Sequence, residues 1–367
     1  MLRIGLVGLP GAGKSTVFDA LVRSSGAHAT TGRTAAGLTP RVATVKVPDP
    51  RLEVLATLYP NRRVVPAEVE FYDVPRPAAD TTAAGRQAPA YLAQLRTMDA
   101  LLHVIAGFDP IAPEALLPTL TARLQEGATE LALADLQVVE NRLTRLESEL
   151  RKLPPGERAT RERERVVLET VGAELNRGGV VRDLSLDAEA QRLLRGFGLL
   201  TAKPTLLIAN LDEARWPLHP TIEAALRAAH AHAATGAVAI MGQWEAELAD
   251  LEPGEAAAFR EALGLAEPAA TRVLVEAYRV AGLISFLTIG EDEVRAWSVP
   301  RGTLAPEAAG AVHSDFQRAF IRAEVVAFED LARVGSWTAA RAAGVLRQVG
   351  KEYVVQDGDV IHFLAGR

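Results

Sequence analysis

Residues 8–16 form the sequence feature that most restricts the fold, because they read Gly-Leu-Pro-Gly-Ala-Gly-Lys-Ser-Thr and match the phosphate-binding loop pattern G-x-x-x-x-G-K-[ST]. The apolar residues 1–7 before the loop are typical of a buried parallel strand. Residues 17–22 after it have the spacing of a helix that packs on that strand. Strand, glycine loop and helix therefore occur in the order that a nucleotide-binding α/β fold requires.

Each loop residue has an expected role in holding a nucleotide. Glycines let the backbone curl so that its N–H groups face phosphate oxygens at a helix N-terminus. Lys14 is expected to reach the terminal phosphates and to act in catalysis, the Ser15 hydroxyl to bind Mg²⁺, and Thr16 to line the α-phosphate side. The expected nucleotide-binding residues of the loop are Gly11, Ala12, Gly13, Lys14, Ser15 and Thr16.

Composition restricts the class of protein. The chain of 367 residues is long enough for about two or three domains, and 49% hydrophobic residues suffice for their cores. The absence of cysteine excludes disulfides and thiolate metal sites. No apolar run approaches the ~20 residues that span a bilayer, and the chain begins with a strand rather than a signal peptide, so we expect a cytoplasmic protein. With a net charge of −6, any contact with nucleic acid must come from a local patch.

An insertion interrupts the α/β pattern. That pattern includes strand candidates at 64–72 and 100–106, continues to about residue 108, and resumes at residues 205–210. Between them, apolar residues recur at steps of three and four, like the seam of a coiled coil. They are Leu136, Val139, Leu143, Leu146, Leu150 and Leu153.

A second helix can return along the first. The Pro-Pro-Gly sequence at 154–156 ends the first helix, and residues 161–175 can run antiparallel to it. The residues expected to pack back are Val166, Val167, Val171 and Leu175. We therefore expect an inserted helical hairpin, with two helices of an ordinary core as the alternative.

Two other segments offer groups that a nucleotide site needs. Asp73 ends an apolar strand, where it can hold Mg²⁺ through water or simply form a turn. Asn210 ends the strand at 205–210, and Glu213 stands where GTP-binding domains have an aspartate that accepts from guanine N1–H and N2–H₂. Glutamate is longer by one methylene, and Leu211 leaves an apolar face for the base, so this segment favours adenine. A plain polar loop is the alternative.

The chain resembles the Obg-related, YchF-type ATPases, which are translation-factor-class P-loop proteins, over nearly its whole length. Besides the loop, the resemblance rests on segments in both halves of the chain. The N-terminal and central ones are residues 5–10, 47–52, 134–143, 203–204, 208–213 and 282–286. The most specific ones are C-terminal, at residues 293–297, 302–306, 313–316, 320–325 and 350–360.

The resemblance implies an α/β fold of three parts. Residues 1–108 and 200–284 would form the P-loop domain, 109–199 a coiled-coil arm, and 285–367 a β-grasp (TGS) domain. It implies ATP hydrolysis with an unusual base preference, an apolar residue in place of the glutamine that orients water, and association with ribosomes. Ribosome or ribosomal RNA would be bound through the arm and the TGS domain, without membrane or DNA.

The chain departs from the family pattern in the switch regions. Gly37 falls near the position of the family's Mg²⁺-binding threonine, and Thr34 or Thr39 can replace it after a small shift. Residues 240–243, Ile-Met-Gly-Gln, stand where the family has an Ala-Lys pair beside the base, so Met241 and Gly242 are the expected contacts there.

Arg76 is the most consequential departure. The family has an aspartate, two further residues and a glycine, and Arg76 stands at the place of that glycine, three residues after Asp73. Two roles compete for this side chain. It can stabilise charge on the γ-phosphate as a built-in arginine finger, or it can block the γ-phosphate sensor and leave a slow or inactive binder. We favour obstruction, because a catalytic arginine needs a fixed geometry.

The C-terminal part has the short Val-, Ile- and Phe-rich segments of a small sheet. Residues 308–326 look helical at their centre, and His313 and Asp315 within them suit capping or packing better than catalysis. His230 and His232 suit neither a zinc pair nor a triad, so we assign no metal beyond Mg²⁺. A local basic face for RNA could come from Arg318, Arg322, Arg341, Arg347 and Lys351.

The sequence thus predicts an Mg²⁺-dependent purine-nucleotide-binding protein with ATP favoured over GTP and weak hydrolysis. Positioning and charge neutralisation would act in place of a protein base. The alternatives are a non-hydrolytic module in which nucleotide sets the angle between the parts, and a GTPase in which Glu213 still binds guanine.

Overall fold

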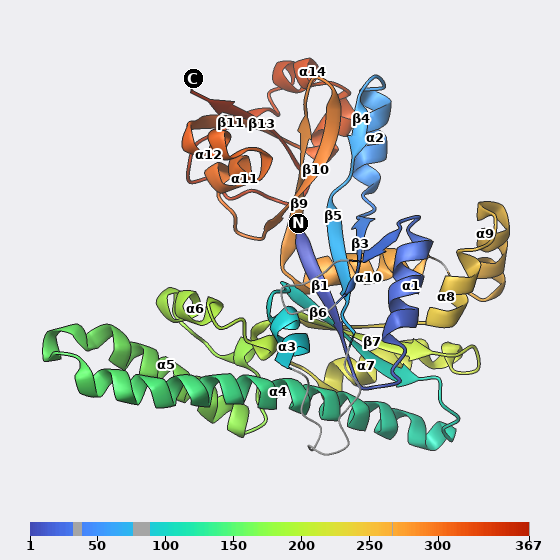
Figure 1. Cartoon of the computed structure of the whole chain (residues 1–367). Coiled ribbons are helices and arrows are strands. Elements are labelled where there is room, and N and C mark those ends of the chain that lie inside the picture. The colour runs from blue at the N-terminus through green and yellow to red at the C-terminus, as the bar shows by residue number, and fades with distance from the viewer. Residues whose placement is uncertain (32–38, 76–88, 266, 367) are drawn as a thin grey trace. The chain divides into compact units, whose positions relative to one another are not determined.

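The structure, a computed structural model, describes residues 1–31, 39–75, 89–265 and 267–366. They form two compact units (Figure 1). The core unit comprises Leu2–Thr44 and Glu70–Glu276, and the C-terminal unit comprises Met1, Val45–Val69 and Ala277–Arg367. The C-terminal unit therefore includes a segment, Val45–Val69, that lies far from the rest of it in the sequence.

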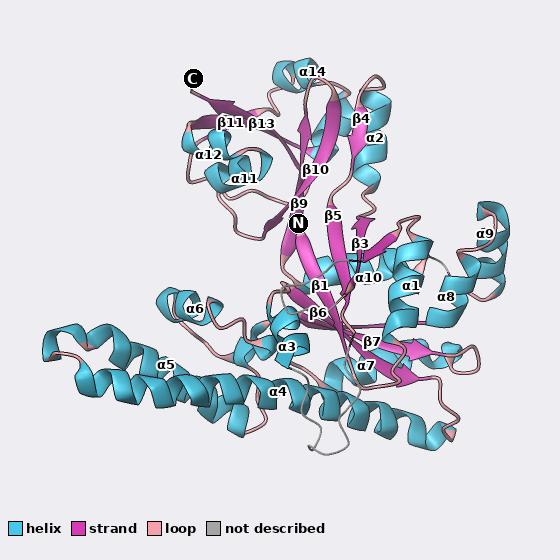
Figure 2. Ribbon diagram, viewed as in Figure 1, coloured by secondary structure: helices cyan, strands magenta, loops and turns pink. Residues whose placement is uncertain are grey.

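A seven-stranded sheet forms the centre of the core unit, in the order β2-β3-β5-β1-β6-β7-β8 (Figure 2). Strands β1, β6, β7 and β8 run parallel, whereas β2 is antiparallel to β3. All residues of β6 and β7 are buried, as in central strands covered on both faces. The strands predicted at 1–7, 100–106 and 205–210 are confirmed. The strands are β1 (Leu2–Val7), β2 (Ala29–Thr31), β3 (Arg41–Lys46), β5 (Glu68–Asp73), β6 (Ala100–Gly107), β7 (Thr205–Leu211) and β8 (Thr235–Ile240).

Helices of the core unit cover this sheet. Leu116 and Leu120 of α4 and Ile222 of α7 share one hydrophobic core with alternate residues of β6, β7 and β8, so both helices pack on the same face. Helix α1 packs beside α8 (Figure 1). The α-helices are α1 (Lys14–Ser24), α3 (Pro89–Arg96), α4 (Pro113–Lys152), α5 (Ala159–Asn176), α6 (Ala188–Arg195), α7 (His219–Ala229), α8 (Gly242–Leu248), α9 (Pro253–Ala262) and α10 (Ala269–Val280). Short 3₁₀ turns are η1 (Pro155–Glu157), η2 (Val181–Asp183), η3 (Leu200–Ala202) and η4 (Trp216–Leu218).

Helices α4 and α5 form the predicted hairpin, with the break at Pro-Pro-Gly between them (Figure 1). Val139 of α4 packs with Val171 of α5 in its core. The prediction was wrong for Val166, which is 56% exposed, because the buried face of α5 follows the helical repeat through Leu168 instead. Helix α4 is 40 residues long, so one helix both covers the sheet and forms the arm.

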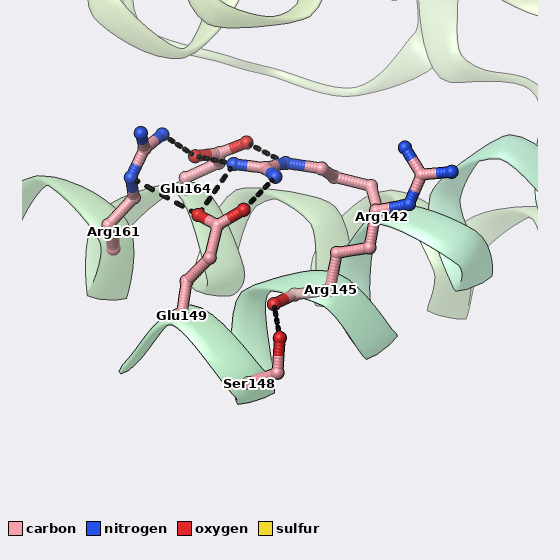
Figure 3. Close-up of polar contacts among 6 residues, drawn as sticks. All are labelled: Arg142, Arg145, Ser148, Glu149, Arg161 and Glu164. Atoms are coloured by element: carbon pink, nitrogen blue, oxygen red, sulfur yellow. Dashed lines mark hydrogen bonds and ion pairs between the residues drawn. The ribbon is translucent and has the colours of Figure 1, made fainter. Parts of the chain in front are cut away.

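Charged side chains join the two helices near the tip of the hairpin (Figure 3). Arg142 of α4 donates through Nε to Glu164 of α5 at 2.7 Å and through Nη1 to Glu149 at 2.7 Å. Arg161 of α5 donates to the same Glu164 at 2.9 Å. The hydrogen bond from Arg142 is the main cause that lowers the pKa of Glu164, which is nearly buried. An apolar seam alone tolerates sliding, so these directional contacts fix the register of the arm.

His103 of β6 makes the core unit sensitive to acid. Its side chain is buried, and burial lowers its pKa to about 4 from 6.5. Between about pH 6.5 and 4, His103 is therefore protonated in the unfolded chain but neutral in the folded chain. The free energy of unfolding falls as the pH is lowered through this range. The expected loss is about 3 kcal/mol.

Denaturant unfolding at about pH 7 and about pH 5 tests this expectation, with His103→Gln as the non-titrating variant. The wild type should lose more stability than the variant between the two pH values. An equal loss in both proteins would assign the acid sensitivity to other groups.

Gly127 of α4 lies against the His103 ring. This contact lets us predict whether a Gly127→Ala substitution raises or lowers the stability of the core unit. A Cβ atom at this position would stand 2.4 Å from His103 Nε2. Alanine gains about 1 kcal/mol in helix propensity, but overpacking a core costs about 1–3 kcal/mol, so Gly127→Ala should destabilise the core unit. Thermal unfolding measures this change.

Gly172 of α5 provides the matched control, because its nearest atom, Val139 Cγ1, would be 3.6 Å from the new Cβ. Gly172→Ala should stabilise by about 0.5–1 kcal/mol. Stabilisation by both substitutions would contradict the close packing of His103 on α4.

A six-stranded sheet forms the C-terminal unit, in the order β12-β11-β13-β9-β10-β4. Phe286, Ala323 and Phe363 lie in the core on one of its faces. Its strands are β4 (Arg63–Val65), β9 (Leu283–Ile289), β10 (Glu293–Pro300), β11 (Phe320–Ala327), β12 (Arg347–Val349) and β13 (Asp359–Ala365). Its helices are α2 (Pro50–Leu58), α11 (Ala305–Val312), α12 (Ser314–Arg318), α13 (Phe328–Val334) and α14 (Trp337–Ala342).

Strand β4 comes from the N-terminal half of the chain and pairs parallel with β10, with Val64 opposite Val294. The single strand predicted at 64–72 is therefore wrong: the chain breaks at residues 66–67 and supplies β4 to one sheet and β5 to the other. Arg51 of α2 adds an ion pair with Asp357 at 2.8 Å. The division into units thus differs from the expected domains at residues 45–69, and the three domain boundaries stay a prediction.

Residues 308–326 are only partly helical. The helical expectation at their centre is confirmed by α12, and from Phe320 onward the chain forms β11, which pairs with β13. His313 caps α12, since its Nδ1 accepts from the Asp315 N–H at 3.2 Å. This matches the expected capping role. Over the described residues, none of the helices combines the length and apolar character that crossing a bilayer requires.

Candidate functional site

The glycine loop joins β1 to α1, and its backbone turns through left-handed conformations to do so. Gly11 and Gly13 have φ values of 77° and 81°. The Ala12 N–H donates to Leu9 O at 3.2 Å, which closes a turn within the loop. Helix α1 begins at Lys14 with no side-chain cap and no acidic residue in its first turn. Its N-terminus is therefore suited to an anion.

Lys14 folds back over this loop. Its Nζ donates to Gly8 O and to Leu9 O, each at 3.0 Å. Ser15 in the first turn of α1 is exposed, and Thr16 is half-buried. The loop thus presents an ammonium group, a hydroxyl and backbone N–H groups on one local surface.

Asn210 links the loop to the opposite side of the site. It lies in β7, is 4% exposed, and its Oδ1 accepts from the Gly242 N–H at 3.1 Å. Its Nδ2 lies 3.5 Å from Ala12 O, and a Cβ atom on Gly13 would come within 2.4 Å of Nδ2. The structure therefore brings together three segments from residues 12–13, 210 and 242.

Leu211 and Met241 are placed differently from the residues around them. Leu211 is 3% and Met241 1% exposed, and both belong to the hydrophobic core under α4 and α7. Their side chains lie on the core face because side chains alternate along β7 and at the end of β8. Their expected base contacts stay predictions.

Glu213 follows β7 and is exposed, with its backbone oxygen accepting from the Trp216 N–H at 3.2 Å. Its neighbour Asp212 pairs with Arg215 instead. The Glu213 carboxylate is therefore on the surface of the loop that leaves the strand. This placement leaves its expected role at the base untested.

Asp73 ends β5 with its side chain 9% exposed, next to an arginine that the sequence did not suggest. Arg41 Nη1 of β3 lies 3.7 Å from Asp73 Oδ2, and Arg41 also pairs with Asp19 of α1. The hydrogen bond that Arg41 donates to Asp19 is the main cause that raises the pKa of Arg41. Only strand pairing brings residues 41 and 73 together, so no local sequence signal could have shown this neighbour.

Of the remaining switch residues, only Thr39 belongs to the described part of the chain. Thr39 is described and exposed. Arg76, Thr34 and Gly37 lie outside the described residues. The two competing roles of Arg76 therefore stay open.

A cavity of about 180 Å³ adjoins the loop and exposes another residue that sequence reasoning missed. Its walls include Pro10 and Gly11 of the loop and Arg123 of α4. Arg123 donates to Ala106 O at 2.6 Å and pairs with Asp109 at 2.6 Å. Residue 123 was expected in the arm, and the structure places it beside the loop, in the part of α4 whose Leu116, Leu120 and Leu124 pack in the core on the sheet. The spacing of Leu116, Leu120 and Leu124 is the signal that could have shown this.

No group of three or more His, Cys, Asp or Glu side chains suited to a metal ion occurs among the residues that the structure describes. His232 Nδ1 lies 2.6 Å from Asp183 Oδ2, and His230 Nε2 lies 3.0 Å from Arg182. Arginine is always a donor, so His230 accepts there and is neutral. Both histidines are thus bound within the fold.

Two of the five residues of the expected basic face of the C-terminal unit, Arg318 and Arg341, are in ion pairs. Arg318 binds Asp315 at 2.9 Å, and Arg341 binds Glu324 at 2.9 Å. Arg322 and Lys351 are exposed. A role in RNA binding stays a prediction.

Comparison with known proteins gives full-length matches. A family model described as "50S ribosome-binding GTPase" matches residues 3–142, and the C-terminal YchF-GTPase model, described as "Protein of unknown function (DUF933)", matches residues 283–366. The chain is 36% identical to the Ribosome-binding ATPase YchF of Haemophilus ducreyi over 98% of both chains, and 36% identical to that of Bacillus subtilis over 99% of this chain and 98% of the relative.

More distant matches agree with these. Obg-like ATPase 1 of Oryza sativa subsp. japonica is 33% identical over 99% of this chain and 91% of the relative. The solved structure of the Schizosaccharomyces pombe YchF GTPase superposes with a TM-score of 0.81 at 28% identity, over 99% of this chain and 97% of that chain. The architecture described above is therefore shared along the whole chain.

Proposed function

Because the chain belongs to the YchF-type family of Obg-like ATPases, we propose that it is an Mg²⁺-dependent, ribosome-associated ATPase with weak turnover. The observation that carries the nucleotide part is the contact of Asn210 with both the glycine loop and Gly242. It joins the segments expected to hold phosphates and base into one site. The proposed nucleotide-binding residues are Gly11, Ala12, Gly13, Lys14, Ser15, Thr16, Asn210, Leu211, Glu213, Met241 and Gly242.

The proposed base preference is adenine over guanine. Its support is Glu213 in place of an aspartate and the ATPase names of several relatives, although the Schizosaccharomyces pombe structure is titled a GTPase. A carboxylate fixed at the base would repel the N1 acceptor of adenine, and the exposed position of Glu213 is compatible with its lying away from the base.

The residues present fit Mg²⁺ by their chemistry. Ser15 offers an exposed hydroxyl in the first turn of α1, and Asp73 offers a carboxylate at the end of β5. Such oxygens are the ligands that Mg²⁺ prefers. We assign them to the ion, with Thr39 as a further oxygen donor. When bound, Mg²⁺ would supply charge neutralisation on the phosphates.

The chain's own contribution to hydrolysis would be positioning. Lys14 would neutralise the terminal phosphates, and the loop N–H groups would orient them. Slow turnover would follow from an apolar residue in place of the water-orienting glutamine, as the family resemblance implies, and from obstruction by Arg76, which lies outside the described residues. Arg76→Gly should raise the hydrolysis rate if Arg76 obstructs and abolish it if Arg76 is catalytic.

The proposed partner is the ribosome, because relatives are named ribosome-binding ATPases. We assign the contact to the helical arm, residues 109–199, and to the TGS domain, residues 285–367, with residues 1–108 and 200–284 as the nucleotide domain. The proposed setting is the cytoplasm.

Replacing Lys14 with alanine should weaken Mg²⁺–ATP binding by about 2–3 kcal/mol, or about 30- to 150-fold, because charged hydrogen bonds to phosphate are lost. Calorimetric titration with ATP, ADP and GTP measures this loss. Lys152→Ala is the control, since Lys152 is exposed at the end of α4. Unchanged affinity of the Lys14 variant would contradict the proposed site.

The same titration separates the alternatives. Tighter binding of ATP than of ADP would mean that the γ-phosphate is sensed. Equal affinity would mean that the segment at residues 73–76 no longer senses the γ-phosphate and would favour a static scaffold that the nucleotide stabilises. A clear preference for GTP would overturn the adenine assignment.

A further inference from the structure

The C-terminal unit contains a cavity of about 360 Å³ that the proposed function does not use. It lies wholly within that unit, between the segment at 45–69 and the sheet. Its volume is in the range of small-molecule sites, which begins at about 300 Å³. The lining residues are Tyr59, Arg62, Ile289, Glu324, Trp337, Arg341, Ile361 and His362.

Aromatic rings form much of the wall. Trp337 at the start of α14 and His362 of β13 meet edge to face, with ring centroids 6.4 Å apart. Tyr59, just after α2, accepts from the Trp337 backbone N–H at 3.2 Å. The Tyr59 hydroxyl proton is therefore directed elsewhere, and it has no acceptor within the described residues. Flat rings with a hydroxyl donor suit a flat, polar ligand.

The cavity is lined by two arginines, which favour an anionic group on the ligand, and by one carboxylate, which favours N–H donors. Glu324 of β11 is 8% exposed, and its two oxygens accept from Arg341 Nη2, each at 2.9 Å, while its Oε2 also accepts from Trp337 Nε1 at 3.4 Å. Arg341 itself is 62% exposed, so its guanidinium is accessible to solvent. Arg62 stacks on Tyr59 at 4.8 Å and makes no ion pair in the part of the chain that the structure describes. Two cations thus face one carboxylate.

We propose that this cavity binds a guanine nucleotide, either free or at the end of an RNA strand. A nucleotide has the three required features: a π face for Trp337 and His362, N–H donors for Glu324, and a phosphate for Arg62 and Arg341. Guanine is the base whose one edge combines two donors, N1–H and N2–H₂, with an acceptor, O6. The donors match Glu324 and the acceptor matches the Tyr59 hydroxyl.

Other ligand classes match less well. A neutral sugar has no anionic group for Arg62 and Arg341, and a phosphorylated tyrosine has no ring N–H donor for a buried carboxylate. Uracil offers one N–H between two carbonyls, which a carboxylate repels. This site is distinct from the loop at residues 8–16, so the inference goes beyond the proposed function.

Calorimetric titration of the full-length Lys14→Ala chain with GMP, AMP and UMP tests the inference, because that background weakens the loop site. GMP should bind about tenfold more tightly than AMP or UMP. Glu324→Gln and Arg62→Gln should each weaken GMP binding about tenfold. Matched controls are Glu352→Gln and Arg63→Gln, whose side chains are exposed outside the cavity and should leave GMP binding unchanged.

Two further arms complete the test. Trp337→Phe keeps an aromatic ring in the wall of the cavity. Thermal unfolding of this variant and of the other variants verifies that each protein is folded. Single-stranded oligonucleotides ending in guanosine that bind with the same sensitivity to Glu324→Gln would identify RNA as the source; binding of GMP alone would identify a free nucleotide.

The inference fails if folded protein does not bind GMP, if AMP or UMP binds equally well, or if Glu324→Gln and Arg62→Gln have no effect. GMP binding that Lys14→Ala removes and Glu324→Gln does not would belong to the loop and would also overturn it. None of these outcomes bears on ATP binding by the wild-type loop, so the two proposals fail separately.

Discussion

Replacing Asp135 with alanine is expected to lower the free energy of unfolding of the core unit by about 3–5 kcal/mol. Asp135 lies in α4, is 0% exposed, and binds Arg96 of α3 at 2.6 Å. It also accepts from the backbone N–H groups of Leu200 at 3.0 Å and Thr201 at 2.8 Å, and from the Thr201 hydroxyl at 2.8 Å. One carboxylate thus joins α3, α4 and η3.

The size of this effect follows from what is left behind. Without the carboxylate, Arg96 remains largely buried with its charge unpaired, and two backbone N–H groups lose their acceptor. The arm helix α4 and the chain segment that returns to β7 would separate at this point. Loss of a surface carboxylate has no such consequence.

Urea unfolding followed by circular dichroism measures the change, with Glu147→Ala as the control on the exposed face of the same helix. The control should change stability by less than about 0.5 kcal/mol. A loss of less than about 1 kcal/mol for Asp135→Ala would mean that water replaces the carboxylate and that the junction does not depend on it.

Gly13→Ala is expected to remove measurable nucleotide binding and to destabilise the core unit by about 2–4 kcal/mol. A left-handed φ of 81° costs an L-residue about 1–2 kcal/mol. The new Cβ would in addition stand 2.4 Å from Asn210 Nδ2. Asn210 would have to move, and the Gly242 N–H would lose the acceptor that it now has at 3.1 Å.

Gly11→Ala separates the two causes. Gly11 has a similar φ of 77°, but no atom lies within 4 Å of its added Cβ. It should therefore show only the conformational cost of about 1–2 kcal/mol. Calorimetric titration and thermal unfolding of both variants provide the comparison. Equal effects of the two substitutions would refute the role of Asn210 as the link between loop and base segments.

Features encoded in short, contiguous segments were predictable from the sequence. The glycine loop, the strands at 100–106 and 205–210, and the break after α4 depend on residues within a few positions of each other. Asn210 was predicted to belong to the site from its place at the end of a strand, and the structure puts it against Ala12 and Gly242. Parallel strands end at one edge of a sheet, so this proximity follows from fold class.

Local pattern failed wherever a distant partner decided the outcome. Residues 64–72 have one apolar pattern, yet Val64 pairs with Val294 and the residues after 67 enter another sheet. Phe320 begins a strand because β13 is available to pair with it. Val166 and Leu168 are both apolar, and only the packing of α5 on α4 selects which is buried.

The sequence by itself determined the phosphate-binding loop, the α/β class and the helical hairpin, because each is written in local spacing and residue type. Only the tertiary structure decided that residues 45–69 join the C-terminal unit, that Arg41 lies beside Asp73, and that Arg123 adjoins the loop. These depend on contacts between segments tens to hundreds of residues apart. The free energy that stabilises these contacts comes from apolar burial and strand pairing between segments, which neither segment can provide alone.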